Sequence, residues 1–415
     1  MKVLWFSPFP GLSDVYLNHN YKGGGWIRSL EKNIQDKVDL SVAFYYNETI
    51  EPFKIGNTNY FPIKRFKNGR LSKTKRRLVN GIEPLADVKL FLKVIENVKP
   101  DIIHIHGAEN HFGLVQKYID VPTVVSIQGT ITVYRHKYFS TISYADVLKH
   151  SKIKSFLFLS TFVNVYKRFA KMARREQDIY HVTKHFIGRT AWDRRVTSVL
   201  AHSANYYHND EILRDVFYQK KWTSKPINKL ILFTTNGPDI YKGIETLLEC
   251  ANLLDTNNIK FEWKVAGLKK GAELVHIAAK SVGKPISANI TFLGTLDVEA
   301  LAEGLLNAHV YVATSHIENS PNSLCEAQIL GLPCIATNAG GTSSLLQDEV
   351  DGVLIQDGDP FSMAGAIMEL QNNYEKAILF GERSRKRALL RHDPQIITND
   401  LLTIYKTVLE NESAN

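Results

Sequence analysis

The chain has 415 residues, of which 44% are hydrophobic and 22% charged, and its formal net charge is +9. This length is too great for one ordinary core and fits two domains, since single cores stop growing at roughly 250 to 300 residues. The composition excludes a largely disordered chain. Three cysteines without a CxxC pair favour neither a disulfide framework nor a zinc site, and we expect Cys250, Cys325 and Cys334 to be small buried fillers.

The chain begins with MKVLWFSPFPG, which predicts a first β-strand and not a signal peptide, because prolines interrupt the apolar run. Short β-branched or aromatic runs then alternate with helical stretches: DLSVAFYY, DIIHIHG, PTVVSIQG, HFIGR and VTSVLAHS, and later KLILFTT, FEWKVAG, ITFLG, HVYVATS and PCIAT. Strands separated by helices predict right-handed crossovers and parallel sheets. Two such series predict an α/β fold of two Rossmann-like, doubly wound domains facing across a cleft, with the ligand at the carboxyl ends of the strands.

The periodicity is lost between Asn209 and Lys229, which places the domain break there. We expect an N-terminal domain over residues 1–215, a linker over 216–228 and a C-terminal domain over 229–392. The last stretch, 393–415, has no strand to follow and predicts a helix that packs back onto the first domain. Charge follows this division: residues 1–225 carry a net +17, residues 226–375 a net −10 and the remainder +2.

Two features of the first domain suggest anion binding. Gly23, Gly24 and Gly25 precede a helix, where free N–H groups favour a phosphate, although a tight turn explains them equally well and the GxGxxG spacing is absent. The basic run KRFKNGRLSKTKRR covers Lys64 to Arg77, and no acidic residue occurs between Pro52 and Ile82. A solvated loop and a contact with anionic lipid explain this run equally well. A contact with nucleic acid is not expected, because no nucleic-acid motif is present.

The strand DIIHIHG carries His104 and His106, which we expect to point to opposite faces and therefore not to chelate one metal ion. His106, nearer the carboxyl end, could reach the cleft or be a packed, hydrogen-bonded residue. Further on, Phe158, Phe162, Tyr166, Phe169 and Met172 form one helical stripe opposed by basic residues. A core-facing helix is favoured slightly over a helix lying on a membrane. No apolar run approaches the roughly 20 residues that a membrane span needs. We therefore expect a cytoplasmic protein, with a peripheral contact at the inner membrane as an option.

In the second domain, HVYVATS is followed by SHIENSPNSLCEAQILGLP. Ser320 is a good N-cap, Pro321 suits the first helical position and Gly331 is a C-terminal stop, which predicts a helix from Pro321 to Leu330. The first N–H groups of this helix can hold a diphosphate, whereas carboxylates accept from hydroxyls. A diphosphate with one glutamate on each side predicts a nucleotide sugar, with ribose on one side and hexose on the other.

The two glutamates are Glu318 and Glu326. Together with LCEAQILGLPCIATNAGG, they resemble the EX7E signature of the retaining glycosyltransferases of family 4. This family is among the group 1 glycosyltransferases, which have the GT-B fold. The glycine loop, DIIHIHG, VVSIQG, YKGIETLLE and FLGTLD follow in the family's order over nearly the whole chain. The resemblance implies that Glu318 contacts the donor sugar, that Glu326 binds the ribose and that Lys242 counters the leaving-group charge. It further implies contacts of the donor with these residues: Gly24, Gly25, Leu296, Asn322, Ser323 and Leu324.

Two residues depart from the family pattern. The histidine expected after VVSIQ is Gln128, which can hold a sugar hydroxyl but cannot titrate. The arginine expected six residues before Lys242 is Asn236. Arg189 could supply the missing cation, although a structural role for it is favoured. Asp357 and Asp359 form a DxD pair, but Asp359 before Pro360 is better explained as an N-cap than as a metal ligand.

The sequence therefore predicts a retaining, metal-independent hexosyltransferase without a cofactor, which uses a UDP- or GDP-sugar. Catalytic roles fall on Glu318, Lys242, Gln128 and His106. The acceptor would be a glycan or a lipid-linked glycan in bacterial surface polysaccharide biosynthesis (capsule, O-antigen or exopolysaccharide). Three alternatives stay open: a non-catalytic subunit that binds sugar nucleotides or glycans, a sugar-nucleotide epimerase, and a phosphorylase.

Overall fold

The computed structural model of the chain describes residues 1–17, 24–64 and 78–413. The chain forms two compact units. Unit 1 comprises residues 1–135, 167–214 and 392–415, and unit 2 comprises residues 136–166 and 215–391. Gly23 and positions 65–77 of the basic run lie outside the described residues.

Unit 1 is built on an eight-stranded sheet with the order β3-β4-β2-β1-β5-β6-β7-β8. All its pairings are parallel except β3 with β4. Its strands are β1 (Lys2–Ser7), β2 (Asp39–Tyr46), β3 (Phe53–Ile55), β4 (Thr58–Lys64), β5 (Ile102–His106), β6 (Thr123–Ser126), β7 (His185–Gly188) and β8 (Asn205–His208). The central strands are buried on both faces, which is why they read as continuous apolar runs.

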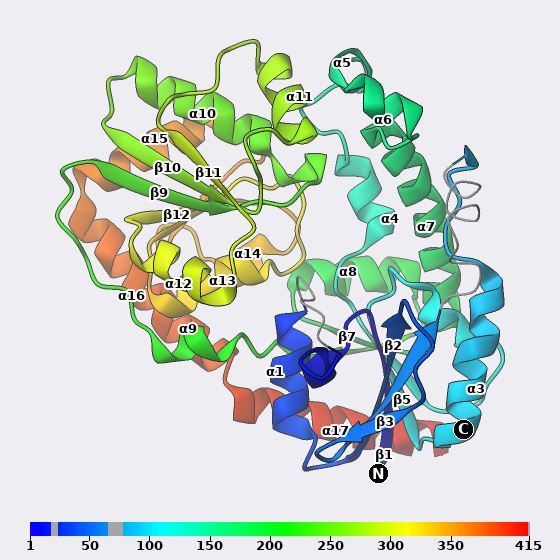
Figure 1. The fold of residues 1–415 in the computed structure, drawn as a ribbon. Coiled ribbons are helices and arrows are strands. Elements are labelled where there is room, and N and C mark those ends of the chain that lie inside the picture. The colour runs from blue at the N-terminus through cyan, green and yellow to red at the C-terminus, as the bar shows by residue number, and fades with distance from the viewer. Residues whose placement is uncertain (18–23, 65–77, 414–415) are drawn as a thin grey trace. The chain divides into compact units, whose positions relative to one another are not determined.

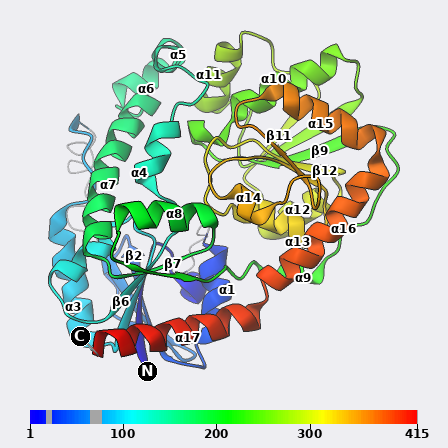
Figure 2. The same ribbon diagram turned by 180° about the vertical axis from the view of Figure 1, so that it is seen from behind.

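Helices of unit 1 pack around this sheet (Figure 1). They are α1 (Gly25–Ile34), α3 (Val88–Val98), α4 (Ile131–Tyr134), α8 (Ala191–Leu200), α17 (Pro394–Ser413) and the larger part of α7 (Phe162–Val182), with 3₁₀ turns η1 (Gly11–Asp14), η2 (Leu85–Asp87), η3 (His111–Lys117) and η4 (Arg135–Lys137), the last ending in unit 2. The C-terminal helix α17 lies in this unit against α1, as both ribbon views show (Figures 1 and 2).

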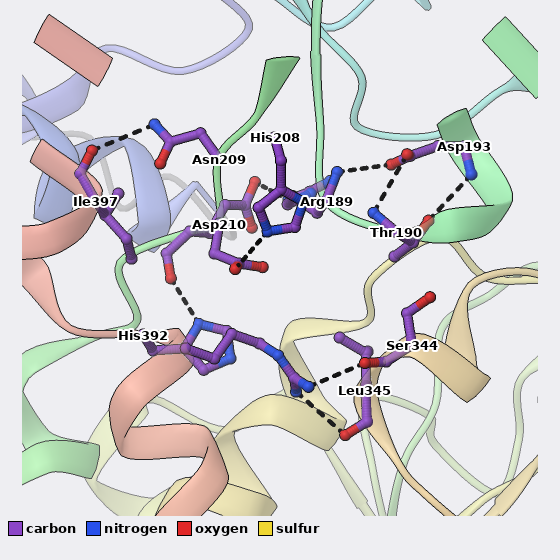
Figure 3. Close-up of polar contacts among 12 residues, drawn as sticks. Arg189, Thr190, Asp193, His208, Asn209, Asp210, Ser344, Leu345, His392 and Ile397 are labelled. Atoms are coloured by element: carbon purple, nitrogen blue, oxygen red, sulfur yellow. Dashed lines mark hydrogen bonds and ion pairs between the residues drawn. The ribbon is translucent and has the colours of Figure 1, made fainter. Parts of the chain in front are cut away.

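The expectation of a strand at VTSVLAHS is wrong, because Ala191–Leu200 is helix α8. Thr190 and Asp193 form a capping box at its start: the Thr190 hydroxyl accepts from the Asp193 N–H at 3.1 Å, and the Asp193 carboxylate accepts from the Thr190 N–H at 3.2 Å (Figure 3). This reciprocal cap fixes a helix start ahead of β-branched residues that otherwise favour a strand.

Unit 2 holds a six-stranded parallel sheet with the order β11-β10-β9-β12-β13-β14. Its strands are β9 (Leu230–Thr235), β10 (Phe261–Ala266), β11 (Ile290–Gly294), β12 (Val310–Ala313), β13 (Cys334–Thr337) and β14 (Val353–Ile355). Its helices are α5 (Tyr144–His150), α6 (Ile153–Leu157), α9 (Asp215–Gln219), α10 (Ile244–Thr256), α11 (Glu273–Val282), α12 (Val298–Leu306), α13 (Asn322–Leu330), α14 (Thr342–Leu345), α15 (Pro360–Asn372) and α16 (Tyr374–Arg391), with the 3₁₀ turn η5 (Ile240–Lys242). Two α/β units with parallel sheets confirm the predicted fold class.

The units differ from the expected domains in two segments. Residues 136–166 follow β6 and α4 of unit 1 but pack in unit 2, where α5 contacts α11. The Thr141 hydroxyl donates to Glu245 at 2.6 Å, and the Ser155 hydroxyl donates to Glu273 at 2.5 Å. The expected linker is also packed, since the Trp222 indole is buried and donates to the Ala308 carbonyl at 2.8 Å.

Candidate active site

The loop after β12 leads into α13, which begins at Asn322 with Pro321 as its N-cap. The expected cap by Ser320 is wrong: the helix starts one residue later and has no side-chain cap. Its first internal bond runs from the Leu324 N–H to the Pro321 carbonyl at 3.0 Å, so the N–H groups of Asn322 and Ser323 precede the helical ladder. Gly331 ends the helix at φ +89°, as predicted.

Glu318 precedes this helix and meets Lys242, which follows the neighbouring parallel strand β9. The Lys242 ammonium lies 2.5 Å from the Glu318 carboxylate, and the Ser315 hydroxyl donates to the same oxygen at 2.8 Å. The Gly341 N–H holds the Glu318 backbone carbonyl at 2.8 Å. The side chains are 25% and 12% exposed, so the pair is accessible to a ligand.

Lys242 is fixed by the turn that joins β9 to α10. Gly243 follows it at φ +69°, and a Cβ there would lie 1.9 Å from the Thr314 carbonyl oxygen, so only glycine fits. The Lys242 carbonyl accepts from the Asn236 side-chain amide at 3.0 Å and from the Thr314 hydroxyl at 2.9 Å. Asn236, which stands where the family pattern has arginine, thus braces the loop of Lys242.

The remaining predicted donor residues of unit 2 lie on α13 or near it. Glu326 is 4% exposed and Leu324 is fully buried, both on α13. Leu296 is half-buried in the loop between β11 and α12. The structure places Lys242, Glu318 and Asn236 in one contact network, with the start of α13 four residues after Glu318.

Sequence reasoning missed the buried pair His316 and Glu245, which stands beside this network. The His316 ring nitrogen Nε2 lies 2.5 Å from the Glu245 carboxylate. The backbone N–H of His316 donates to the Tyr241 carbonyl at 2.8 Å. These bonds fix the loop that carries Glu318 against the turn that carries Lys242. The signal available in the sequence was a histidine two residues before the first glutamate of the motif.

A second polar cluster lies in unit 1, at the carboxyl ends of β5, β6 and β7. It surrounds a pocket of about 400 Å³, counted with its open mouth, and the residues that line it include Trp26, His104, His106, Ser126, Gln128, Arg189, Asn209 and Glu211. The pocket thus brings together three of the predicted site residues, His106, Gln128 and Arg189.

The expectation that His104 and His106 face opposite sides is wrong. Their ring centroids are 3.9 Å apart, because residues two apart on a strand share a face. His104 contacts the Tyr405 hydroxyl at 2.7 Å and the Ser126 hydroxyl at 2.6 Å. Burial lowers the pKa of His104 to about 3. Burial and His104 lower the pKa of His106 well below its usual range, and neither His106 ring nitrogen has a hydrogen-bond partner among the described residues.

Arg189 is 6% exposed and forms an ion pair with Glu211, and its guanidinium donates to the Ile127 carbonyl at 2.9 Å. A weaker contact of 3.4 Å reaches the Gln128 side chain. Figure 3 shows Arg189 among the loops that follow β7 and β8. These contacts hold Arg189 within unit 1, and its role as a cation for the donor stays a prediction.

Side chains pack closely around the glycines at the start of α1. Gly24 has φ +75° and a Cβ there would lie 2.4 Å from the Phe9 ring. A Cβ at Gly25 would lie 2.7 Å from the Arg214 side chain. A tight turn accounts for both glycines, and the phosphate interpretation stays a prediction.

Glu109 is a further acidic group of unit 1 that the sequence did not reveal. It accepts from the Gly129 N–H at 2.8 Å, directly after Gln128, and burial and nearby Glu176 raise its pKa to about 7. Gly107, at φ +100°, leaves room for the Glu109 carboxylate. A Cβ at position 107 would lie 2.2 Å from that carboxylate and 3.5 Å from the Gln128 side chain. The carboxyl is therefore held beside the residue that replaces the family's histidine.

The DxD aspartates are engaged elsewhere. Asp359 caps α15 by accepting from the N–H groups of Phe361 and Ser362 at 3.0 and 2.9 Å, which confirms the N-cap interpretation. Asp357 pairs with Lys137 at 3.0 Å. Among the described residues no cluster of three or more His, Cys, Asp or Glu side chains has the arrangement of a metal site.

The chain is similar to known proteins in sequence and in fold. Residues 218–387 match the family described as glycosyl transferases group 1. The D-inositol 3-phosphate glycosyltransferase of Geodermatophilus obscurus is 38% identical over 101 residues, which are 24% of this chain and 22% of that protein. The O-antigen chain mannosyltransferase C of Escherichia coli is 27% identical over 176 residues, 42% of this chain and 45% of that protein. The aligned stretches thus span less than half of these curated relatives.

Solved structures match over the full length. Sucrose-phosphate synthase of Thermosynechococcus elongatus has a TM-score of 0.74 at 15% identity and covers 99% of both chains. Anabaena HepE, solved with UDP and glucose, has a TM-score of 0.64 at 15% identity and covers 98% of this chain and 99% of that one. These likenesses establish the GT-B fold. The region that matches the group 1 glycosyl transferase model carries Lys242, Glu318 and α13.

Proposed function

We propose that the protein is a retaining glycosyltransferase that moves a sugar from a UDP- or GDP-sugar to a hydroxyl of a glycan or lipid-linked glycan in bacterial surface polysaccharide biosynthesis. The family match over unit 2 supports glycosyl transfer. The names of relatives, such as the capsular polysaccharide biosynthesis glycosyltransferase CapM of Staphylococcus aureus and the O-antigen mannosyltransferase, support the class of product. A structural neighbour that holds UDP-glucose supports the class of donor.

The observation that carries the proposal is the Lys242 and Glu318 pair ahead of the N-terminus of α13. In the free protein the glutamate neutralises the lysine. A diphosphate on the N–H groups of Asn322 and Ser323 would offer Lys242 a second anion, and the helix dipole would add to the attraction. Charge that develops on the departing diphosphate would then meet donors already in place.

The two glutamates take different roles in this proposal. Glu318 accepts from hydroxyls of the donor sugar, and Glu326, four residues into α13, accepts from the ribose. Leu296 and Leu324 border the nucleotide. In unit 1, Gln128 and the neutral His106 offer polar atoms for sugar hydroxyls. Asp357 forms an ion pair and Asp359 caps a helix, so we assign stabilisation of the leaving group to Lys242 and the N-terminus of α13. Retention of anomeric configuration is inferred from the family resemblance alone.

No helix in the described ranges 1–17, 24–64 and 78–413 is long and apolar enough to cross a membrane. The proposal includes a peripheral contact with the bilayer surface, where the sugar of a lipid-linked acceptor would lie.

The test is donor hydrolysis without acceptor, after thermal-shift screening with UDP-, GDP-, ADP- and CMP-sugars to find the donor. Slow release of nucleotide is expected for a transferase, whereas a binding subunit would give a thermal shift and no release. Lys242→Met should lower turnover about 100-fold, because one charged donor to the leaving group is lost. Lys229→Met is the matched control, since it breaks a surface pair with Glu262 in the same unit and should leave turnover unchanged.

A further inference from the structure

An apolar cluster lies exposed on the segment of unit 2 that follows α5. Ile153 is 78% exposed, Leu157 74%, Phe158 61% and Phe156 44%. We call these four residues the α6 patch. Four large apolar side chains within six consecutive residues are more than the scattered single residues that a soluble surface usually shows.

The patch faces away from unit 2 because the opposite face of α6 is bound to it. Ser155 is buried, and its hydroxyl donates to the Glu273 carboxylate at 2.5 Å. The Lys152 N–H donates to the other oxygen of Glu273 at 2.9 Å, and α6 lies near α11 in both ribbon views (Figures 1 and 2). Ile153 and Leu157, four residues apart, share the outer face.

Basic residues surround the patch. Lys149, Lys152 and Lys154 are exposed, and no acidic residue occurs in the sequence from Val147 to Arg175, a stretch that contains eight lysines and arginines. Two carboxylates lie close to these lysines and keep their charge: Glu273 accepts the bonds of α6, and Asp146 accepts from the Ser143 hydroxyl at 2.6 Å. The patch is therefore apolar at its centre, and its rim carries more lysines than carboxylates.

We propose that the α6 patch inserts into the surface of an anionic lipid bilayer. Lysines are depleted in protein interfaces, which disfavours a protein partner. Apolar side chains that enter the acyl boundary beside lysines that meet lipid phosphates are the pattern of an interfacial anchor. The inference rests on exposure and charge and does not depend on which sugar is transferred.

Of the predicted amphipathic stripe, the α6 patch contains only Phe158, which lies between α6 and α7. Phe158 precedes α7, which begins at Phe162, so the stripe is not one helix. Phe162, Tyr166 and Phe169 are partly buried, whereas the α6 residues are exposed. The membrane contact is thus assigned to the α6 patch and not to the rest of the stripe.

Vesicle co-sedimentation tests the assignment, with phosphatidylcholine vesicles with and without phosphatidylglycerol. The triple variant Ile153→Ser, Leu157→Ser, Phe158→Ser should lower binding to the anionic vesicles more than tenfold. Lys149→Gln and Lys154→Gln should each lower it about fivefold, and only with phosphatidylglycerol present. Phe361→Ser is the matched control, because Phe361 is 67% exposed in the same unit beside two aspartates, and it should bind like the wild type.

Unchanged binding of the triple variant would overturn the proposal. So would loss of binding only when Lys73, Lys75, Arg76 and Arg77 are neutralised, since the basic run would then be the anchor. A change in oligomeric state on size exclusion, with vesicle binding retained, would assign the patch to protein contacts instead. Donor hydrolysis by the triple variant should equal that of the wild type, so failure of this inference and failure of the proposed transferase activity give different results.

Discussion

Gly340 is the residue whose replacement tests the placement of Glu318 most directly. It has φ +60°, and a Cβ built there would lie 2.1 Å from the Glu318 carbonyl oxygen. Real Cβ contacts lie at 3.0 Å or more, so in Gly340→Ala the backbone of Glu318 must retreat by about 0.9 Å. A shift of about 1 Å in a reacting group costs on the order of 100-fold in rate. We expect turnover, measured as donor hydrolysis or transfer, to fall by about that factor.

Gly283→Ala is the matched control for backbone strain, because Gly283 has φ +70° and open space around its Cβ position. Left-handed strain should cost each variant about 1 kcal/mol of stability in urea unfolding, and Gly340→Ala should lose more because of its clash with the Glu318 carbonyl. Only Gly340→Ala should lose turnover. If the two variants kept equal activity, the position of Glu318 would not matter and its assignment to the donor sugar would be wrong.

Three further predictions follow from named contacts. Glu326→Ala should weaken nucleotide binding about tenfold by calorimetry, whereas Glu318→Ala should mainly lower turnover; full activity of both would refute the two assignments. Burial raises the pKa of Glu176 to about 7 against the hydrogen bonds that it accepts from Thr132 and Ile131. The folded protein therefore favours the protonated form of Glu176. The free energy of unfolding, measured by urea titration, should fall by up to about 3 kcal/mol as the pH rises from 4.5 through 7. Glu176→Gln should flatten that slope, and an unchanged slope would contradict the shift. Asp359→Ala should cost about 1 kcal/mol through the lost cap of α15 while activity stays insensitive to EDTA; loss of activity restored by Mg²⁺ or Mn²⁺ would revive the metal role.

Much of unit 2 could be predicted because its signals are local. The strand before Glu318, the helix that follows it and its glycine stop depend on residues close in sequence, and only the cap at Ser320 was misplaced, by one position. The pairing of Lys242 with Glu318 was not readable as a contact, since it spans 76 residues and arises from the adjacency of β9 and β12. Likewise, the Thr141 contact with Glu245 joins segments 104 residues apart and has no local signature.

Unit 1 was predicted less well at its polar residues. The shared face of His104 and His106 follows from the period of a strand, and the sequence was misinterpreted there. The partners of Arg189 could not be foreseen, because Glu211 comes from the loop after β8 and the Ile127 carbonyl from the end of β6. Burial, which moves the pKa of His104 and Glu109, is a property of packing and not of composition.

The path of residues 136–166 bears on how such proteins are recombined. The chain passes between the units at residues 135/136, 166/167, 214/215 and 391/392, so neither unit is one uninterrupted piece of sequence. Exchange of residues 215–391 alone for those of a relative would leave Thr141 and Ser155 facing foreign partners in place of Glu245 and Glu273. A chimaera that is meant to transplant unit 2 therefore has to carry both residues 136–166 and residues 215–391. A library with a single crossover cannot transfer these two segments without the part of unit 1 that lies between them.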